Sequence, residues 1–224
     1  MLISVHLPKT AGASFAELLR AVFDNRLHFD YADFPINADP VARHTAAITA
    51  SLAIATDAGL RADCIHGHFL PVKYLLRASS RPPVTFVTWL RHPVERVVSH
   101  YHFWRRYQPN DLPRLHRRML EEDWSLEQFC LCSELQNLYG QFFWAFPVTN
   151  FSFVGVTEYF ATDLTYFSRH FLGVADGVVA PQCNARGIVE DLDPVLRTAI
   201  ERYHDADMEL YRWACTRRAQ RLET

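Results

Sequence analysis

The sequence has no long hydrophobic run and no large excess of charge of either sign. No stretch of about 18 uncharged apolar residues occurs among its 224 residues, so we expect no membrane span. The net charge of −2 argues against a dedicated nucleic-acid-binding protein, which usually carries a basic excess. Met1 leads almost directly into an apolar segment, without the basic region and apolar run of a secretory signal. We therefore expect a cytoplasmic protein that binds no nucleic acid.

Cysteine is scarce, and its spacing does not indicate a metal site. There are five cysteines, and Cys130 and Cys132 form a lone C-x-C without a matching second pair. An odd number of scattered cysteines favours reduced, mainly buried thiols over disulfides or zinc ligands.

Arginines gather in two short regions although the chain as a whole is nearly neutral. The two clusters are Arg105, Arg106, Arg114, Arg117 and Arg118, and Arg212, Arg217, Arg218 and Arg221. Each cluster forms either a contact for an anionic partner or an ordinary solvated face, and the solvated face is the favoured interpretation.

Apolar segments rich in β-formers alternate with helical patterns along the chain. The candidate strands are residues 2–7, 63–66, 84–90, 151–156 and 177–180. The candidate helices are residues 14–23, 40–58, 93–107, 126–145 (one helix or two), 163–171 and 193–221, with Ser14 and Thr162 as expected caps. This alternation predicts an α/β fold in which residues 1–224 form a single domain with a central parallel sheet flanked by helices.

The segment VHLPKTAGASF, residues 5–15, reads as a strand, a turn of small residues and the start of a helix. Such a turn directs backbone N–H groups and the positive helix end at one place, and Lys9, Thr10 and Ser14 add further donors. The alternative is an ordinary turn with a surface lysine. The lysine precedes Gly12, opposite to the order in nucleotide-hydrolysing loops, and no aspartate ends the strand at 84–90 to hold magnesium. The turn therefore predicts an anion site without an obvious metal.

A second motif, TWLRHPVERVVSHY at residues 88–101, brings Arg91 to the carboxyl end of a strand and Ser99 into the following helix. A guanidinium and a hydroxyl from neighbouring elements can hold one phosphate together. In the alternative interpretation, Arg91 pairs with an acid such as Glu95 and Ser99 is a surface residue.

A third motif, CIHGHFLP at residues 64–71, places His66 and His68 around a glycine at a strand end. A neutral imidazole suits a general base that takes a proton from an alcohol. The alternatives are a metal-binding pair and two hydrogen-bonded structural histidines. No third ligand follows at metal-ligand spacing, so we expect no metal.

The segments HLPKTAGASF and LRHPVERVVSHY together resemble the donor-binding motifs of the carbohydrate (family 2) sulfotransferases, which include the heparan sulfate 2-O-sulfotransferases. In that family the motifs read approximately H-I-P-K-T-G-G-T-S-F and L-R-D-P-V-E-R-x-x-S-x-Y. Weaker likeness at residues 66–68, 151–160 and 206–214 extends the resemblance over most of the chain.

The resemblance implies a P-loop nucleotide-kinase-like sulfotransferase fold that uses 3′-phosphoadenosine-5′-phosphosulfate (PAPS) as donor and needs no metal. By position, the residues that would hold the 5′-phosphosulfate are Lys9, Thr10, Ala11, Gly12, Ala13 and Ser14. Arg91 and Ser99 would hold the 3′-phosphate. His68 would be the catalytic base, with His66 as its supporting neighbour, and Lys9 would stabilise the departing phosphate oxygen.

The chain departs from the family pattern at three positions. Ala11 replaces a glycine, which restricts the loop if that position needs a positive φ. Ala13 replaces a residue that is often threonine, and His92 replaces an aspartate. Glu158, Asn184 and Arg186 lie in stretches that are further candidates to reach the nucleotide.

The acceptor implied by the resemblance is a hydroxyl on a glycan or glycolipid. The aromatic residues available to stack on sugar rings are Phe103, Trp104, Tyr107, Phe142, Phe143 and Trp144, although most are expected in the core. Two other functions remain open from the sequence, an ATP-dependent kinase-like phosphotransferase and a non-catalytic nucleotide- or glycan-binding module.

Overall fold

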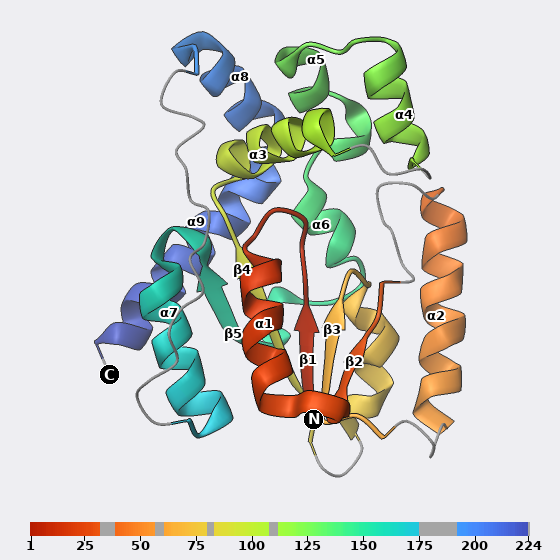
Figure 1. Cartoon of the computed structure of the whole chain (residues 1–224), viewed down its shortest axis with the longest axis vertical. Helices are drawn as coiled ribbons and strands as arrows, with labels where there is room; N and C mark the ends of the chain where they lie inside the picture. The colour runs from red at the N-terminus through yellow and green to blue at the C-terminus, as the bar shows by residue number, and fades with distance from the viewer. Residues whose placement is uncertain (32–38, 57–60, 80–82, 108–111, 175–191, 224) are drawn as a thin grey trace.

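The computed structural model describes residues 1–31, 39–56, 61–79, 83–107, 112–174 and 192–223. Its centre is a parallel sheet with strand order β2-β3-β1-β4-β5 (Figure 1). The strands are β1 (Leu2–Val5), β2 (Leu27–Phe29), β3 (Cys64–Gly67), β4 (Thr85–Leu90) and β5 (Phe151–Val156). Every strand pairing is parallel, so each connection must cross from one end of the sheet to the other. The predicted α/β class with a central parallel sheet is confirmed.

Helices and short helical turns make these connections. The α-helices are α1 (Gly12–Phe23), α2 (Pro40–Thr56), α3 (Pro93–Arg106), α4 (Arg114–Glu121), α5 (Leu126–Cys130), α6 (Leu138–Phe142), α7 (Phe160–Phe167), α8 (Pro194–Tyr203) and α9 (Asp205–Leu222). The 3₁₀-helical segments are η1 (Asp24–Arg26), η2 (Pro71–Ser79), η3 (Ser133–Leu135), η4 (Val148–Asn150) and η5 (Thr157–Tyr159). One further segment, η6 (Ser168–Leu172), is a π-helix.

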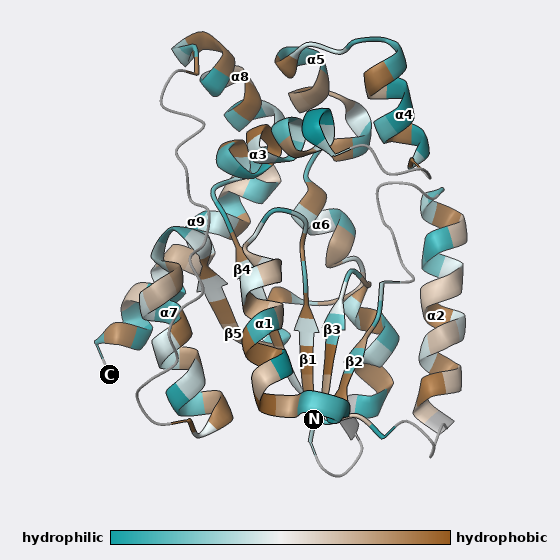
Figure 2. Cartoon of the chain, viewed as in Figure 1, coloured by the Kyte–Doolittle hydropathy of each residue, from teal (hydrophilic) through white to brown (hydrophobic). Residues whose placement is uncertain are grey.

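Alternate residues of the strands face two separate apolar layers. Leu2 of β1 packs with Phe15 of α1 and Leu164 of α7 on one face of the sheet. Ile3 and Val5 pack on the other face, in a cluster to which η2, α6 and α9 contribute. In Figure 2 the strands are mostly hydrophobic, whereas the helices around them alternate between hydrophobic and hydrophilic residues along their length. Burial on both faces explains why the strand sequences are nearly continuous in apolar residues.

A third apolar cluster lies beyond the carboxyl ends of the strands. Val94 and Val97 of α3 pack there against Leu115 of α4, Phe129 of α5 and Ile200 of α8. Figure 1 shows α3 lying across this end of the sheet, with α4, α5 and α8 around it. The β4–α3 connection is therefore held between the sheet and a second packed layer.

The outer side of β5 is tied to α7 and α9 by charged side chains. Asp163 of α7, fully buried, accepts a hydrogen bond from the Val156 N–H at 2.9 Å and ion-pairs with Arg218 at 2.8 Å and Arg221 at 3.0 Å. Arg221 also donates to the Val154 carbonyl at 3.1 Å. These bonds satisfy backbone groups that the sheet leaves unpaired at its edge.

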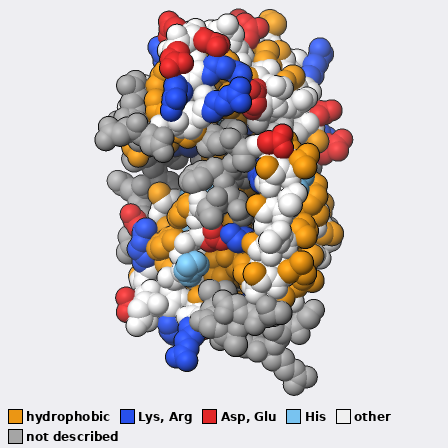
Figure 3. Space-filling model, turned by 90° about the vertical axis from the view of Figure 1, so that its right-hand side faces the viewer, with side chains coloured by type: hydrophobic (Ala, Val, Ile, Leu, Met, Phe, Trp, Pro, Cys, Tyr) orange, Lys and Arg blue, Asp and Glu red, His pale blue; other side chains and the backbone are white. Residues whose placement is uncertain are grey.

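Helix α2 packs against η2 through Ala47, which meets Leu70 and Val72. On the same helix the His44 ring stacks on Trp144 with centroids 3.7 Å apart. The face of the molecule that carries α2 shows many apolar side chains (Figure 3), and Val41, Ile48 and Leu52 of this helix are exposed. None of the helices in the described part of the chain combines the length and the apolar character needed to cross a membrane.

Several sequence predictions about element boundaries are wrong. Residues 193–221 form two helices rather than one, because the buried His204 bonds to Cys130 and Asn137 between them. Neither Ser14 nor Thr162 is a cap: α1 already begins at Gly12 and α7 at Phe160. Strand β2, helix α4 and turn η2 were not predicted, and the proposed strand at 177–180 lies outside the described residues.

Candidate functional site

The three predicted motifs lie at the carboxyl ends of three neighbouring strands. Lys9 follows β1, His68 follows β3 and Arg91 follows β4, and β1 pairs with β3 on one side and β4 on the other. The chain leaves β1 toward the β3–β2 side and later returns to β4 on the opposite side. Open α/β sheets bind ligands at such a switch point, because loops that run in opposite directions leave a crevice between them.

The loop after β1 takes a conformation that side chains rarely adopt. Lys9 has φ of 68° and Ala11 has φ of 64°, both left-handed, and Thr10 donates from its hydroxyl to the Leu7 carbonyl at 2.9 Å. The cap residue of α1, Ala11, makes no side-chain hydrogen bond to the amino end of the helix, which begins at Gly12. Left-handed turns gather backbone N–H groups into a concave anion site, and the uncapped helix end adds its own N–H groups.

Gly12 lies directly against the ring of His6. A Cβ atom at this position would come within 1.7 Å of His6 Nε2, closer than any real contact. The glycine therefore allows the loop to pack on a histidine that the sequence analysis did not select. The His6 ring in turn stacks on His68, with centroids 4.3 Å apart, and joins the loop to the third motif.

The Lys9 ammonium lies 4.1 Å from the centroid of the exposed Phe103 ring of α3. Burial lowers the pKa of Lys9, and the nearby guanidinium groups of Arg91 and Arg106 lower it further. Within the described ranges, no carboxylate forms an ion pair with Lys9, Arg91 or Arg106. These side chains are an uncompensated group of positive charges, which favours binding of an anion.

Arg91 does not form the ion pair considered in the sequence analysis. Glu95 instead pairs with Arg197 of α8 at 2.8 Å. The Arg91 backbone is bonded to the Tyr139 hydroxyl, and the next amide, His92 N–H, donates to Glu158 at 2.7 Å. Glu158 thus fixes the β4–α3 junction, whereas Asn184 and Arg186 lie outside the described residues.

Ser99, the second residue proposed for the 3′-phosphate, is half-buried on α3. Helix α3 starts directly after the Arg91–His92 junction, so both predicted phosphate residues belong to the β4–α3 segment at this end of the sheet.

His68 has a defined tautomer. Its Nδ1 bonds to the His6 carbonyl, and a carbonyl only accepts, so Nδ1 carries the hydrogen. Nε2 is therefore the ring nitrogen whose lone pair can accept a proton. Burial lowers the pKa of His68 below its ordinary value, with the His6 carbonyl bond acting in the opposite direction. The imidazole is thus neutral at pH 7, the form that a general base requires.

His66 is enclosed rather than open to a ligand. Its side chain is buried, Nδ1 lies 2.8 Å from Ser4 Oγ, and its ring stacks on His6 with centroids 5.1 Å apart. Burial lowers the pKa of His66 to about 3. His66 is therefore enclosed by Ser4 and His6 and is linked to His68 only through the ring of His6.

The arginine clusters are largely neutralised by internal partners. Arg105 pairs with Asp123 at 2.5 Å and Arg118 with Glu134 at 3.0 Å, and the second cluster is anchored to Asp163 through Arg218 and Arg221. Arg106 differs, because it contributes to the positive charge around Lys9. Arg105 and Arg118 are partly exposed, as the solvated-face interpretation expects. Arg218 and Arg221 are mostly buried against Asp163, so for these two residues neither alternative of the sequence analysis is right.

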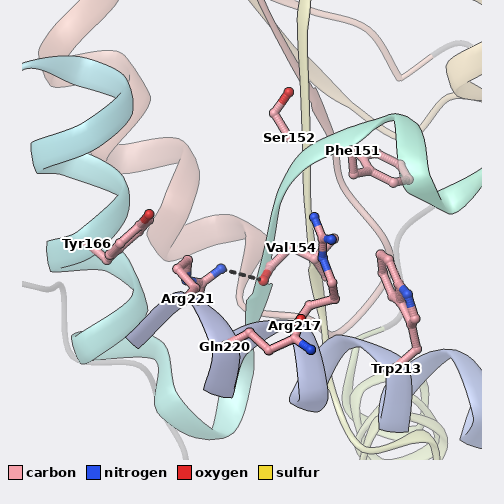
Figure 4. A pocket seen from close by; sticks show the side chains of 8 residues that line it. All are labelled: Phe151, Ser152, Val154, Tyr166, Trp213, Arg217, Gln220 and Arg221. Atoms are coloured by element: carbon pink, nitrogen blue, oxygen red, sulfur yellow. Dashed lines mark hydrogen bonds between the residues drawn. The ribbon is translucent and has the colours of Figure 1, made fainter. Parts of the chain in front are cut away.

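A pocket of about 290 Å³ lies at the other end of the sheet, beside the amino-terminal half of β5 (Figure 4). Its lining residues are Phe151, Ser152, Val154, Tyr166, Trp213, Arg217, Gln220 and Arg221. None of these belongs to the three motifs, and Figure 4 shows Arg221 already bonded to the Val154 carbonyl. The pocket is thus separate from the candidate site.

None of the cysteines in the described ranges belongs to the three motif loops after β1, β3 and β4. Cys64, Cys130 and Cys132 are buried free thiols, and burial raises the pKa of Cys130 to about 12 and that of Cys132 to about 11. Over the part of the chain that the structure describes, no group of His, Cys, Asp and Glu side chains is arranged to hold a metal ion.

The strand order, the phosphate-type loop after β1 and the helices on both faces define the sulfotransferase fold, as the sequence predicted. A crystal structure of a sulfotransferase from Alicyclobacillus acidocaldarius has a TM-score of 0.50 at 16% identity and covers 94% of this chain and 93% of its own. Mouse sulfotransferase SULT7A1 complexed with PAP has a TM-score of 0.38 at 14% identity, covering 90% of this chain and 62% of its own. The sequence matches no protein-family model and no curated protein. At these identities the likeness establishes the fold, and the reaction must be argued from the site.

Proposed function

We propose that residues 1–224 form one sulfotransferase domain that transfers a sulfuryl group from PAPS to an acceptor hydroxyl. The observation that carries this proposal is the proximity of Lys9 to Arg91 and Arg106, without carboxylate partners in the described chain. The same loop contains His6, whose ring stacks on the neutral His68. A cluster of cations suits a donor with several negative groups, and a neutral imidazole suits deprotonation of an alcohol.

In this proposal the β1–α1 loop binds the 5′-phosphosulfate. Lys9 supplies a full charge, and Ser14 offers its hydroxyl from the first turn of α1. Because the Thr10 hydroxyl is already bonded to the Leu7 carbonyl, Thr10 contributes its backbone N–H group, as do Ala11, Gly12 and Ala13. The left-handed residues and the uncapped α1 end support this assignment. Arg91 and Ser99, from the β4–α3 segment, bind the 3′-phosphate.

The proposed reaction takes place between donor and acceptor, and residues of this chain supply the base and the positive charge that it needs. The acceptor oxygen attacks sulfur while His68 Nε2 takes the hydroxyl proton, so a new O–S bond forms. The bond between sulfur and the bridging oxygen breaks, and its electron pair stays on that phosphate oxygen. Lys9 and the loop N–H groups stabilise this developing charge, a contribution of a few kcal/mol for each preorganised donor. The products are a sulfate ester, adenosine 3′,5′-bisphosphate and a protonated His68.

A carbohydrate acceptor is the finer part of the proposal. Trp104, Phe142 and Phe143 are buried, whereas Phe103 and Tyr107 are exposed and stack on each other with centroids 5.1 Å apart. Because Phe103 also contacts Lys9, this pair offers a flat apolar surface beside the proposed sulfuryl group. Such a surface matches the apolar face of a sugar ring better than a small aliphatic alcohol.

The decisive experiment compares His68→Ala with the parent protein and with His28→Ala, which removes an exposed histidine of β2. Transfer of labelled sulfuryl groups from PAPS is measured over a panel of glycans and small alcohols. We expect His68→Ala to lower turnover by about 10²–10⁴-fold, the usual contribution of a positioned base. Binding of adenosine 3′,5′-bisphosphate should change less than about twofold in calorimetry, because His68 is not assigned to the donor phosphates.

Other outcomes identify the rival functions. Near-normal turnover in His68→Ala removes the base from the mechanism. Donor binding without transfer to any acceptor by the parent protein supports a non-catalytic binding module. Magnesium-dependent transfer from ATP supports a kinase-like phosphotransferase.

A further inference from the structure

The backbone of Arg91 is held by a single phenol rather than by a neighbouring strand. The Arg91 N–H donates to the Tyr139 hydroxyl at 3.1 Å, and that hydroxyl donates back to the Arg91 carbonyl. The pairing of β4 with β5 ends one residue earlier, at Leu90 and Val156. Tyr139 therefore takes the place of a strand partner at the position where the arginine leaves the sheet.

Tyr139 is itself fixed from the opposite side. It is fully buried in α6, and both oxygens of Asp207 from α9 accept its backbone N–H, at 3.0 and 3.2 Å. The guanidinium of Arg96 lies 5.7 Å from the Tyr139 ring centroid. Burial raises the pKa of Tyr139 well above its ordinary value, so the phenol stays protonated and keeps its donor for the Arg91 carbonyl. Its position is thus set by α9 and α3 together.

The side chain of Arg91, in contrast, has no ion pair to define its direction among the described residues, and it is only partly buried. A long side chain without a fixed partner takes its direction largely from its backbone. The direction in which the Arg91 side chain can meet a phosphate therefore depends on the two backbone bonds to Tyr139.

We propose that Tyr139 is a positioning residue that aims Arg91 and so sets the preference for a 3′-phosphorylated nucleotide. This inference rests on the proposed assignment of Arg91 to the 3′-phosphate. Tyr139 touches neither the donor nor the acceptor in this scheme, and it acts only through Arg91.

The test is Tyr139→Phe, which keeps the buried ring and removes only the hydroxyl. Affinities for adenosine 3′,5′-bisphosphate and adenosine 5′-phosphate are measured by calorimetry. We expect the affinity for the bisphosphate to fall about tenfold, the equivalent of one lost hydrogen bond that leaves buried groups unpaired. Affinity for the monophosphate should change less than about twofold, because it has no group for Arg91 to bind.

The matched control is Tyr101→Phe. The Tyr101 hydroxyl also donates to a backbone carbonyl, that of Trp124 at 3.1 Å, but makes no bond to Arg91. The control should keep the parent ratio of the two affinities even if it lowers thermal stability. Equal weakening of both nucleotides in Tyr139→Phe, or an unchanged ratio, overturns the inference.

Arg91→Ala separates this inference from the proposed function. If Arg91→Ala leaves the affinity ratio unchanged, the 3′-phosphate assignment itself is wrong. If it lowers the ratio and Tyr139→Phe does not, only the positioning role fails. The double variant should show the Arg91→Ala ratio with no further loss. If Tyr139→Phe does not fold, Asp207→Asn, which weakens the support of α6, should lower the ratio in the same direction.

Discussion

Ala11 and Gly12 are neighbours in the loop, yet the structure constrains them for different reasons. Gly12 is required by space, because a side chain there would overlap His6. Ala11 has room for its methyl group but takes a left-handed φ of 64°, which glycine adopts at much lower cost. The sequence raised this possibility for Ala11, whereas the contact of Gly12 with His6 depends on tertiary packing.

Replacing Ala11 by glycine should stabilise the protein. The left-handed conformation costs an alanine about 1–2 kcal/mol. The greater freedom of glycine in the unfolded chain costs about 0.4–1 kcal/mol. We therefore expect the free energy of unfolding to rise by about 0.5–1 kcal/mol, measured by urea unfolding.

Ala13→Gly is the matched control, because Ala13 is exposed in the first turn of α1 and has no positive φ. This variant should lose up to about 1 kcal/mol, the usual cost of glycine in a helix. A loss of stability in Ala11→Gly as well would contradict the strain argument.

The motif residues of the site were predictable, and their surroundings were not. Lys9, Arg91 and His68 stand at strand ends that the apolar pattern marks, and the parallel arrangement then requires them to meet at one edge. His6 stands in the quoted motif, but the motif does not reveal its contact with His68, and Tyr139 carries no local signal. Their roles come from contacts with residues 62 and 48 positions away along the chain, which no local pattern reveals.

At the scale of elements, α8 and α9 are two helices although the sequence between residues 193 and 221 favours one continuous helix. His204 lies between α8 and α9 and is fully buried. Its Nδ1 accepts from the Asn137 N–H at 3.3 Å, so Nε2 carries the hydrogen and donates to the Cys130 carbonyl at 2.8 Å. Tertiary bonds to α5 and α6 thus outweigh the helical periodicity that predicted one element.

His204→Ala should lower the free energy of unfolding by about 2–4 kcal/mol, because it leaves a buried N–H and a buried carbonyl without partners. The measurement is urea unfolding at pH 7.5. Arg202→Ala, an exposed change two residues earlier in α8, should stay within about 0.5 kcal/mol of the parent. A His204→Ala loss as small as that of the control would mean that the break in the helix has another cause.

The strands that the sequence revealed are those with mostly buried apolar residues. Strand β5 was predicted with its observed bounds, since all of its residues except Ser152 are buried. Strand β2 has only three residues, none of them fully buried, and so lacks a readable pattern. The start of α7 was misplaced because Asp163, which resembles a first-turn residue, is instead the buried partner of β5 and α9.

Across the whole molecule, buried neutral histidines make stability depend on pH. The pKa of His66 is about 3 in the folded protein and 6.5 in the unfolded chain, and burial also lowers the pKa of His6, His68 and His100. Between these two values the unfolded chain binds more protons, so stability falls as the pH decreases below about 6.5. Asp207 acts with the opposite sign, because its pKa is raised to about 6.

His66→Gln isolates one of these contributions. Between pH 7 and pH 5.5 the parent should lose about 1 kcal/mol more stability than this variant. This is below the one-proton limit of about 1.36 kcal/mol per pH unit, because the unfolded histidine is only partly protonated over much of the interval. Urea unfolding at the two pH values measures the difference, and the contribution of Asp207 is the same in both proteins. His28→Gln, at an exposed site of β2, should follow the parent. Identical pH dependence of the parent and His66→Gln would show that His66 titrates normally.

The side-chain bonds along β5 also bear on how copies of this chain can associate. Outward backbone groups of an edge strand ordinarily offer a template on which another polypeptide can extend the sheet. Here the Val154 carbonyl and the Val156 amide are already occupied by Arg221 and Asp163 from within the same molecule. Self-assembly by β-augmentation at this edge would first have to break a buried ion pair, so any oligomer of the native protein should form through other surfaces.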